Sequence, residues 1–319
     1  MKLRTELTPS KILNLDLNTK FYSIGSCFAN MIGENLSINK FDCTANPFGI
    51  LYNPISIFNH LLGNLDFDKS MLKNDSIWYN YNLHSNFRNE NRKKYLSELI
   101  LISNNSTSKL IQSNILIITL GTAYVYKSKE TNEIVANCHK KPQKEFIKEL
   151  LTVEQITVLF EKFYKFIIKK NPSIKIIFTV SPVRHIKDTI ELNSVSKSIL
   201  RIATHQLQEN YKNVFYFPSY ELLMDDLRDY RFYKDDLLHP TPFAENYIWE
   251  KFKISIFENN TLKIMNEWIK ITTALNHKSF NPKSNNHQDF LKKQLLKLEE
   301  ITSIINCEKE IKTIRSQII

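Results

Sequence analysis

The most restrictive feature of the sequence is a series of short, strongly apolar segments separated by longer amphipathic ones. Residues 115–120 and 174–180 are the clearest of them, with the sequences ILIITL and IKIIFTV. Apolar segments of this length that alternate with helices are typical of strands buried on both faces of a parallel sheet. The pattern therefore predicts an α/β fold with a doubly wound parallel sheet.

Other segments fit the same alternation. Further strands are expected over 21–25, 41–44 and 214–217, and a hairpin over 124–135 with its turn near 130–132. Helices are expected over 28–36, 55–62, 152–170 and 193–211, and from residue 243 onward. The 152–170 helix begins with a capping-box signature, Thr152 and Gln155. In the 193–211 helix, the apolar side chains on one side are Val195, Ile199, Ile202 and Ala203.

The character of the sequence changes twice along the chain. Residues 64–113 are polar, rich in asparagine and weakly periodic, so we interpret them as an insertion in an α/β domain that spans 1–258. Residues 259–319 form a C-terminal helical extension, with a loop over 276–290 and a charged amphipathic helix over 291–318. This extension either packs on the core or mediates self-association.

Composition and charge argue against several classes of protein. The first ten residues lack an apolar signal-peptide core, and no apolar run is long enough to cross a bilayer, so we expect a cytoplasmic protein without membrane contact. The four cysteines lack CxxC spacing, which fits reduced thiols better than a zinc finger or disulfide framework. The net charge is +10, but the lysines are spread out, so we expect a solvated surface and no nucleic-acid binding.

Ligands of doubly wound sheets bind beyond the carboxyl ends of the strands. Five short segments follow predicted strands there: 26–27, 46–49, 121–122, 181–185 and the loop that ends at His239. These segments are where candidate functional residues are expected.

The first of these segments carries two nucleophile-capable side chains, Ser26 and Cys27, at a turn that leads into a helix. Amides at a helix N-terminus can lower a thiol pKa or stabilise an oxyanion. The alternative is structural: Ser26 as the helix N-cap and Cys27 as a small buried residue.

The last segment, DDLLHP, places Asp236 three residues before His239. In a turn, this spacing lets the carboxylate reach one ring nitrogen while the other faces a nucleophile. The alternative is a surface histidine near an acidic side chain.

Six ordered motifs give the sequence a specific resemblance. They are IGSCFA (24–29), NPFGILYNP (46–54), LGTAYVY (120–126), NCHKKP (137–142), TVSPVRHIKD (179–188) and LRDYRFYKDDLLHP (227–240). Together they resemble the GSCFA-domain family, a branch of the SGNH/GDSL hydrolase-like superfamily. The resemblance covers roughly residues 18–255 and continues more weakly into HKSFNP (277–282).

The resemblance implies a flavodoxin-like three-layer α/β/α sandwich with a site built from four motif blocks. The first block puts Cys27 on the nucleophile position, and a shift of one residue would put Ser26 there. The last block matches Asp236 and His239. Gly49 matches the oxyanion-hole glycine of the second block.

The third block, Gly-x-Asn, matches Gly121, Thr122 and Ala123, so alanine replaces the oxyanion-hole asparagine. A lost oxyanion donor typically lowers the rate about 10²- to 10³-fold. Thr122, Asn46 or Asn53 are the candidate substitutes.

These observations imply an SGNH-like esterase or acyltransferase whose substrate is a small-molecule or carbohydrate ester. Cys27 or Ser26 would attack, His239 would act as the base oriented by Asp236, and Gly49 and Gly121 would line the oxyanion pocket through backbone N–H groups. The alternative is a catalytically silent binding module that uses the same cleft for a glycan or other polar ligand. No P-loop, GxGxxG, HExxH or metal-ligand spacing of histidines is present, so neither a cofactor nor a metal is expected.

Several other side chains are weaker candidates. Arg184 follows a predicted strand and would hold an anionic group of the substrate, or else form a salt bridge to the acidic loop over 225–236. Cys138 and His139 would line the site or simply pack, and the insertion residues Trp78 and His84 would contribute to a lid. Three residues that lead up to Asp236 are interpreted mainly as scaffolding for its loop: Tyr230, Arg231 and Tyr233.

Overall fold

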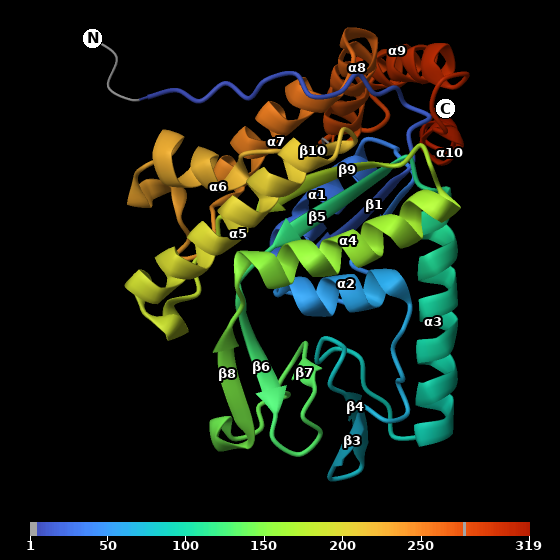
Figure 1. Ribbon diagram of the computed structural model, residues 1–319. Coiled ribbons are helices and arrows are strands. Elements are labelled where there is room, and N and C mark those ends of the chain that lie inside the picture. The colour runs from blue at the N-terminus through green and yellow to red at the C-terminus, as the bar shows by residue number, and fades with distance from the viewer. Residues whose placement is uncertain (1–4, 277–278) are drawn as a thin grey trace.

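The computed structural model describes residues 5–276 and 279–319. Its centre is a five-stranded sheet in the order β10-β9-β5-β1-β2, with every neighbouring pair parallel (Figure 1). The strands are β1 (Phe21–Gly25), β2 (Cys43–Ala45), β5 (Ile115–Leu120), β9 (Lys175–Val180) and β10 (Val214–Tyr216). All five predicted strands are confirmed, and the strand order is that of flavodoxin-like folds.

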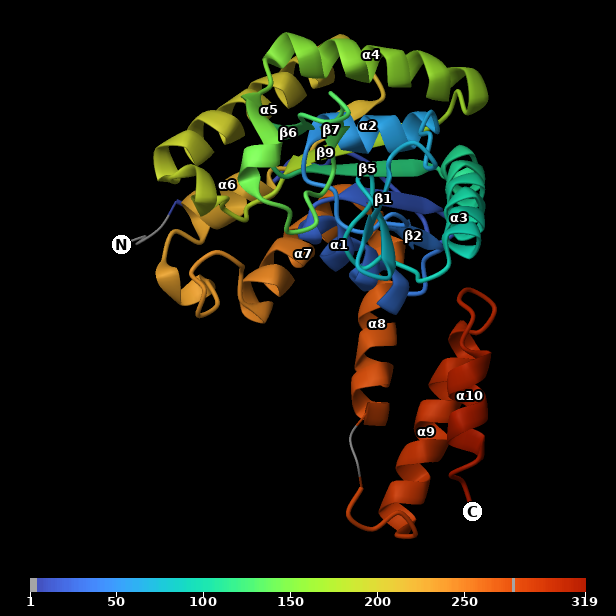
Figure 2. The ribbon, with the colours of Figure 1, turned by 90° about the horizontal axis from the view of Figure 1, so that it is seen from below.

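Helices cover both faces of this sheet. Along β5, Leu116, Ile118 and Leu120 face one apolar cluster, whereas Ile115 and Ile117 face the other. Figure 2 shows α2, α4 and α5 on one side of the sheet, and α1 and α7 on the other. Their bounds are α1 (Cys27–Ile38), α2 (Pro54–Leu62), α4 (Val153–Lys170), α5 (Ile190–Asn210) and α7 (Pro242–Ile256). The strand alternation thus produces the three-layer sandwich that the resemblance implied.

For two of these helices, individual residues can be compared with the prediction. Helix α4 begins after Thr152, and both reciprocal hydrogen bonds of the capping box with Gln155 are present. In α5, however, only half of the predicted apolar side is right: Ala203 is buried and Ile199 packs against the core, whereas Val195 and Ile202 are 45% and 49% exposed. The buried side of α5 instead carries Asn193, Ser196, Lys197, Leu200, Ala203, Thr204 and Leu207.

The polar insertion contains more structure than its weak periodicity indicated. It folds into a hairpin, β3 (Met71–Asn74) and β4 (Ile77–Asn80), followed by the 21-residue helix α3 (Arg92–Gln112). Only four side chains of α3 are buried, which explains why the sequence gives little helical signal there.

A second, antiparallel sheet follows β5. It consists of β6 (Tyr124–Ser128), β7 (Ile134–Val135) and β8 (Phe146–Leu150). The β6–β7 hairpin is confirmed, whereas β8 was not predicted because only its first residue is buried. The remaining short elements are η1 (Gln143–Glu145), η2 (Ile186–Asp188), α6 (Ser219–Glu221), η3 (Leu222–Asp226) and η4 (Tyr230–Phe232).

The C-terminal residues form three helices, α8 (Asn259–Asn276), α9 (Asn285–Ile301) and α10 (Glu308–Arg315). The prediction of one helix over 291–318 is wrong: helix α9 starts earlier, the chain leaves the helix after Ile301, and α10 packs on α9 (Figure 2). Apolar side chains of all three helices form a small cluster of their own. Residues 277 and 278 of the predicted loop lie outside the described residues.

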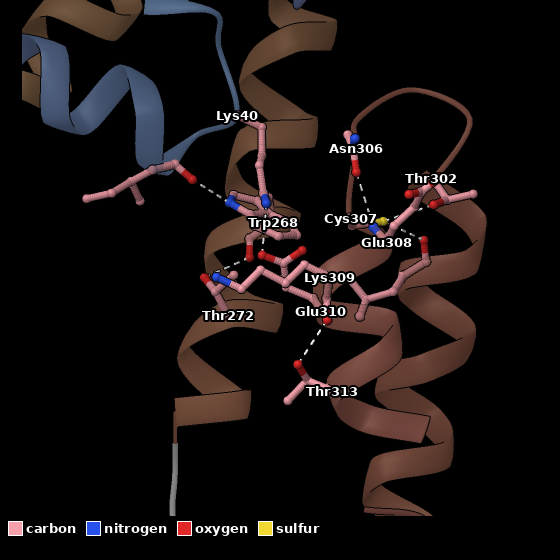
Figure 3. Close-up of polar contacts among 12 residues, drawn as sticks. Lys40, Trp268, Thr272, Thr302, Asn306, Cys307, Glu308, Lys309, Glu310 and Thr313 are labelled. Carbon is pink, nitrogen blue, oxygen red and sulfur yellow. Dashed lines mark hydrogen bonds and ion pairs between the residues drawn. The ribbon is translucent and has the colours of Figure 1, made fainter. Parts of the chain in front are cut away.

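The C-terminal helices are joined to the end of α1 by a polar contact (Figure 3). The indole Nε1 of Trp268 donates to the carbonyl of Ile38 at 2.7 Å. The ammonium of Lys40 lies 4.8 Å from the Trp268 ring centroid and donates to Glu310 at 2.8 Å. Packing on the core, one of the two roles left open for this extension, is therefore observed. Within the described residues, no helix is both long and apolar enough to cross a membrane.

The turn after β1 requires glycine. Gly25 has φ +136°, and a Cβ atom at this position would lie 2.1 Å from the carbonyl oxygen of Thr119 on β5. Gly25 pairs with Thr119 in the sheet register, so β1 and β5 approach closely where the chain turns into α1. Because residue 25 has no side chain, β1 can lie this close to β5, and the N-terminus of α1 therefore lies beside the end of β5.

We expect Gly25→Ala to lower the free energy of unfolding by more than about 3 kcal/mol, because backbone strain and a backbone clash act together. Gly63→Ala is the matched control: Gly63 also has positive φ (+69°), but its nearest neighbour would be 3.6 Å from the new Cβ. The control should lose only about 1 kcal/mol. Urea unfolding of both variants tests this, and equal losses would contradict the role assigned to the Thr119 contact.

Candidate active site

Ser26 is held as the N-cap of α1. Its Oγ accepts a hydrogen bond from the Phe28 N–H at 3.3 Å, and its own N–H donates to the carbonyl of Thr119 at 3.0 Å. The residue is only 1% exposed. The structural alternative considered for Ser26 is thus what its contacts support.

Cys27 is the first residue of α1 and is partly exposed. Burial raises the pKa of its thiol, while the Lys197 ammonium and the N–H groups of Phe28 and Cys27 act in the opposite direction. Glu245, on α7, raises the pKa further. The thiol is therefore protonated at neutral pH and needs a base to become a nucleophile.

Asp236 and His239 form a hydrogen-bonded pair within one turn. The Asp236 Oδ2 lies 2.6 Å from Nδ1 of His239, and Oδ1 accepts from the backbone N–H groups of Leu238 and His239, each at 2.9 Å. These two backbone bonds and the imidazole bond hold the pKa of Asp236 at about 2. Leu237 has φ +57°, a left-handed conformation that allows the turn to close.

This pairing has a chemical consequence for the imidazole. An ionised carboxylate can only accept, so Nδ1 carries the proton and Nε2 of neutral His239 presents its lone pair. The arrangement is that of a general base whose tautomer is fixed by a carboxylate.

Backbone contacts anchor the turn. Tyr233 and Pro240 form an isolated bridge, Lys234 N–H donates to the His239 carbonyl at 2.8 Å, and Thr241 N–H donates to Phe232 at 2.8 Å. Thr241 then caps α7. The interpretation of Tyr233 as scaffolding for this loop is confirmed.

Glu245 is an acidic side chain that affects both candidate catalytic groups. It lies in the first turn of α7; burial raises its pKa, whereas Lys234 and His239 lower it. Glu245 raises the pKa of Cys27, and His239 lowers the pKa of Glu245, so this carboxylate interacts electrostatically with both side chains.

The loop after β2 supports the Cys27 turn. Asn46, at φ +41°, accepts from the Gly25 N–H at 2.8 Å and donates to Asn30 at 2.5 Å. Gly49 has φ +75°, and its N–H donates to the Asn46 carbonyl at 2.8 Å. A Cβ on Gly49 would lie 2.4 Å from that of His84, so the glycine also lets the insertion approach.

In the loop after β5, backbone N–H groups and the Thr122 hydroxyl are also hydrogen-bonded within the protein. The N–H groups of Gly121 and Thr122 both donate to the carbonyl of Tyr52, at 2.8 and 3.0 Å. The Thr122 hydroxyl lies 3.0 Å from Oγ of Ser196 and accepts from the Tyr124 N–H. In this conformation the N–H groups of Gly49 and Gly121, expected to line an oxyanion pocket, instead bond to carbonyls of the protein itself.

Arg184 packs on tyrosines beside the His239 loop. Its guanidinium donates to the Tyr233 hydroxyl at 2.9 Å and lies 4.7 Å from that ring and 5.7 Å from the Tyr230 ring. Arg184 thus ties the loop after β9 to the scaffold of His239. Its predicted contact with a substrate anion stays a prediction.

The weaker candidates contribute mainly to packing. His139 bonds to the carbonyl of Asn80 at 2.8 Å, and Trp78 lies 5.6 Å from both the Lys73 ammonium and the Arg92 guanidinium. Burial raises the pKa of Cys138 to about 11. Among the described residues, no group of three or more His, Cys, Asp or Glu side chains could hold a metal.

Three side chains of this region were not found from the sequence: Tyr52, Lys197 and Glu245. Burial raises the pKa of Tyr52 and Cys27 raises it further, so the phenol and the thiol interact electrostatically. Lys197 lies on the same face of α5 as Leu200 and Ala203, and this spacing is the feature of the sequence that could have indicated that it is buried.

We expect Asp236→Asn to reduce the fraction of His239 that carries its proton on Nδ1, because an amide can donate to that nitrogen where a carboxylate cannot. Asp235→Asn, which removes the adjacent carboxylate, should leave the tautomer unchanged. Nitrogen-15 NMR of the imidazole measures both variants. Identical tautomer populations in wild type and Asp236→Asn would contradict this reading of the pair.

Comparisons with known proteins agree with the motifs. A model described as the GSCFA family matches residues 20–252, and one described as GSCFA domain protein, C-terminal domain, matches residues 268–319. No curated protein matches the chain. A solved structure of an acetyl xylan esterase (Est2A) from the rumen bacterium Butyrivibrio proteoclasticus is similar at 10% identity, with a TM-score of 0.34. The similarity covers 80% of this chain and 66%, slightly under two thirds, of that chain. Because the first family model spans well over half of its residues, the chain belongs to the GSCFA family.

Proposed function

We propose that this protein transfers the acyl group of an ester, to water or to another hydroxyl, through Cys27. The observation that carries the proposal is the Asp236–His239 pair, with 2.6 Å between Oδ2 and Nδ1. A histidine held in this tautomer by an ionised carboxylate is suited to take a proton from a nucleophile and return it to a leaving group.

Cys27 is the better nucleophile of the two adjacent candidates. Its side chain is partly exposed at the first position of α1, whereas Ser26 is 1% exposed and its Oγ accepts from the Phe28 N–H. A thiol is also intrinsically more nucleophilic than a hydroxyl near neutral pH.

The proposed reaction has two steps. In the first, Nε2 of His239 takes the thiol proton, Sγ attacks the ester carbonyl, and the imidazolium returns the proton to the departing alkoxide, leaving a thioester. In the second, Nε2 takes a proton from water or an acceptor hydroxyl, whose oxygen attacks the thioester. The imidazolium then protonates the departing thiolate, which restores Cys27.

The N-terminus of α1 is the proposed source of oxyanion stabilisation. The Cys27 N–H lowers the pKa of the thiol, and the helix dipole adds positive potential at the same place, whereas the Phe28 N–H donates to Oγ of Ser26. Gly49 and Gly121 then shape the site through the close contacts that they permit.

The proposed substrate class is the ester of a carbohydrate or other small polar molecule. Tyr230 is 61% exposed next to the His239 scaffold, and Arg184 stacks against it. An exposed aromatic ring beside a cation offers both a stacking surface and a hydrogen-bond donor to a sugar.

A catalytically silent binding module for a glycan is the second candidate. It is favoured by Ala123 at the position of the oxyanion-hole asparagine and by the engaged N–H groups of Gly49 and Gly121. Such a module would bind its ligand in the same cleft and would catalyse no reaction.

We expect wild-type protein incubated with p-nitrophenyl acetate to gain a single acetyl group and to release nitrophenol. Cys27→Ala should lose the adduct, and His239→Ala should lower the acylation rate by about 10²- to 10⁴-fold with little change in melting temperature. Ser26→Ala should keep the adduct but lose about 1 kcal/mol of stability as a helix cap. Intact mass, absorbance and thermal unfolding provide the measurements.

Two results would overturn the assignment. An adduct lost in Ser26→Ala and retained in Cys27→Ala would assign the serine. No adduct and no release in any protein, with glycan binding detected by calorimetry, would favour the silent binding module.

A further inference from the structure

Lys197 is a fully buried lysine at the carboxyl edge of the central sheet. It is 1% exposed and lies on the buried side of α5. Its ammonium donates to the carbonyl oxygens of Gly121, at 2.7 Å, and Ser181, at 2.6 Å. These residues directly follow β5 and β9, so one side chain connects the ends of the two adjacent strands.

The environment of this ammonium is unusual because both of its described hydrogen-bond acceptors are neutral. Burying a charge without a counter-charge is costly, and burial lowers the pKa of Lys197 to about 7. A hydrocarbon side chain would fill the same space on α5 without this cost.

The anion that this charge can stabilise is the thiolate of Cys27, because Cys27 follows β1 where this strand lies beside the end of β5. The N–H of Ser26 donates to the carbonyl of Thr119 at 3.0 Å, two residues before Gly121, whose carbonyl accepts from Lys197. Lys197 lowers the pKa of Cys27, and Cys27 in turn raises that of Lys197. The other titratable groups that interact with Cys27 come from different elements: Glu245 from α7 raises the pKa of the thiol, and the thiol raises the pKa of Tyr52, which precedes α2.

We propose that Lys197 is a positioning residue of the Cys27 site, which holds the loops after β5 and β9 together and stabilises the thiolate once His239 has taken its proton. The inference rests on the proposed role of Cys27 as nucleophile. Lys197 itself touches carbonyl oxygens of the protein and acts on the reaction through Cys27.

The test measures the thiol itself. Iodoacetamide alkylation of the Cys27 peptide is followed by mass spectrometry between pH 6 and 10 in wild type and in Lys197→Met, which keeps an unbranched side chain. We expect alkylation near pH 7, where Lys197 is still partly charged, to slow about three- to tenfold, with little change above pH 9, where Lys197 is neutral. Lys253→Met is the matched control, since Lys253 is also buried (5% exposed) but pairs with Glu250 on α7, and it should leave the profile unchanged.

A second measurement does not require Lys197→Met to fold. Coupling between two sites is reciprocal, so a permanent negative charge at position 27 must raise the pKa of Lys197. With carbon-13-labelled lysines, NMR titration of Cys27→Asp should reveal one lysine signal whose midpoint is higher than in the neutral matched control, Cys27→Asn.

The outcomes separate this inference from the proposed enzyme activity. A shifted thiol profile or lysine midpoint supports the pair even if p-nitrophenyl acetate yields no adduct. An unchanged Cys27 profile in folded Lys197→Met, or identical lysine titrations in Cys27→Asp and Cys27→Asn, overturns the inference even if the ester is turned over.

Discussion

The close approach of Gly25 to the carbonyl of Thr119 is the constraint on which the candidate site depends. It allows β1 to end against β5 and the chain to enter α1 at once, with Ser26 N–H bonded to the same carbonyl. Asn46 completes the turn from the β2 side by accepting from Gly25 N–H. Three adjacent strands therefore fix the position of Cys27, and its partial exposure follows from where these strands end.

The second half of the site is organised quite differently. Asp236 and His239 are three residues apart, and their contacts lie within one turn. The geometry of such a motif is set by its own local hydrogen bonds and does not depend on where the fold places it. What the fold adds is location: the cap of α7 by Thr241 and the packing of Arg184 on Tyr233 hold the turn beside the carboxyl edge of the sheet.

This difference explains what could be predicted from the sequence. The five parallel strands were predicted because they are buried on both faces, so their composition alone identifies them. The Asp236–His239 pairing was predicted because its spacing is local. Helix α3 and strand β8 were missed because they bury few side chains, and local hydrophobic pattern is the signal that the prediction used. The break between α9 and α10 was missed because the apolar residues Ile304 and Ile305 continue through it and no glycine or proline marks it.

The error in α5 is the most informative for function. A helix on a sheet normally buries its apolar side, but two of the four residues predicted on that side, Val195 and Ile202, are exposed. The buried side carries polar residues near its N-terminal end, where Ser196 bonds to the Ala123 N–H and Lys197 to the Gly121 carbonyl. Polar groups at this end satisfy backbone atoms that leave the sheet as its strands finish. Lys197 also lowers the pKa of Cys27, so the hydrogen bonding at the end of the sheet and the electrostatics of the thiol depend on the same side chain.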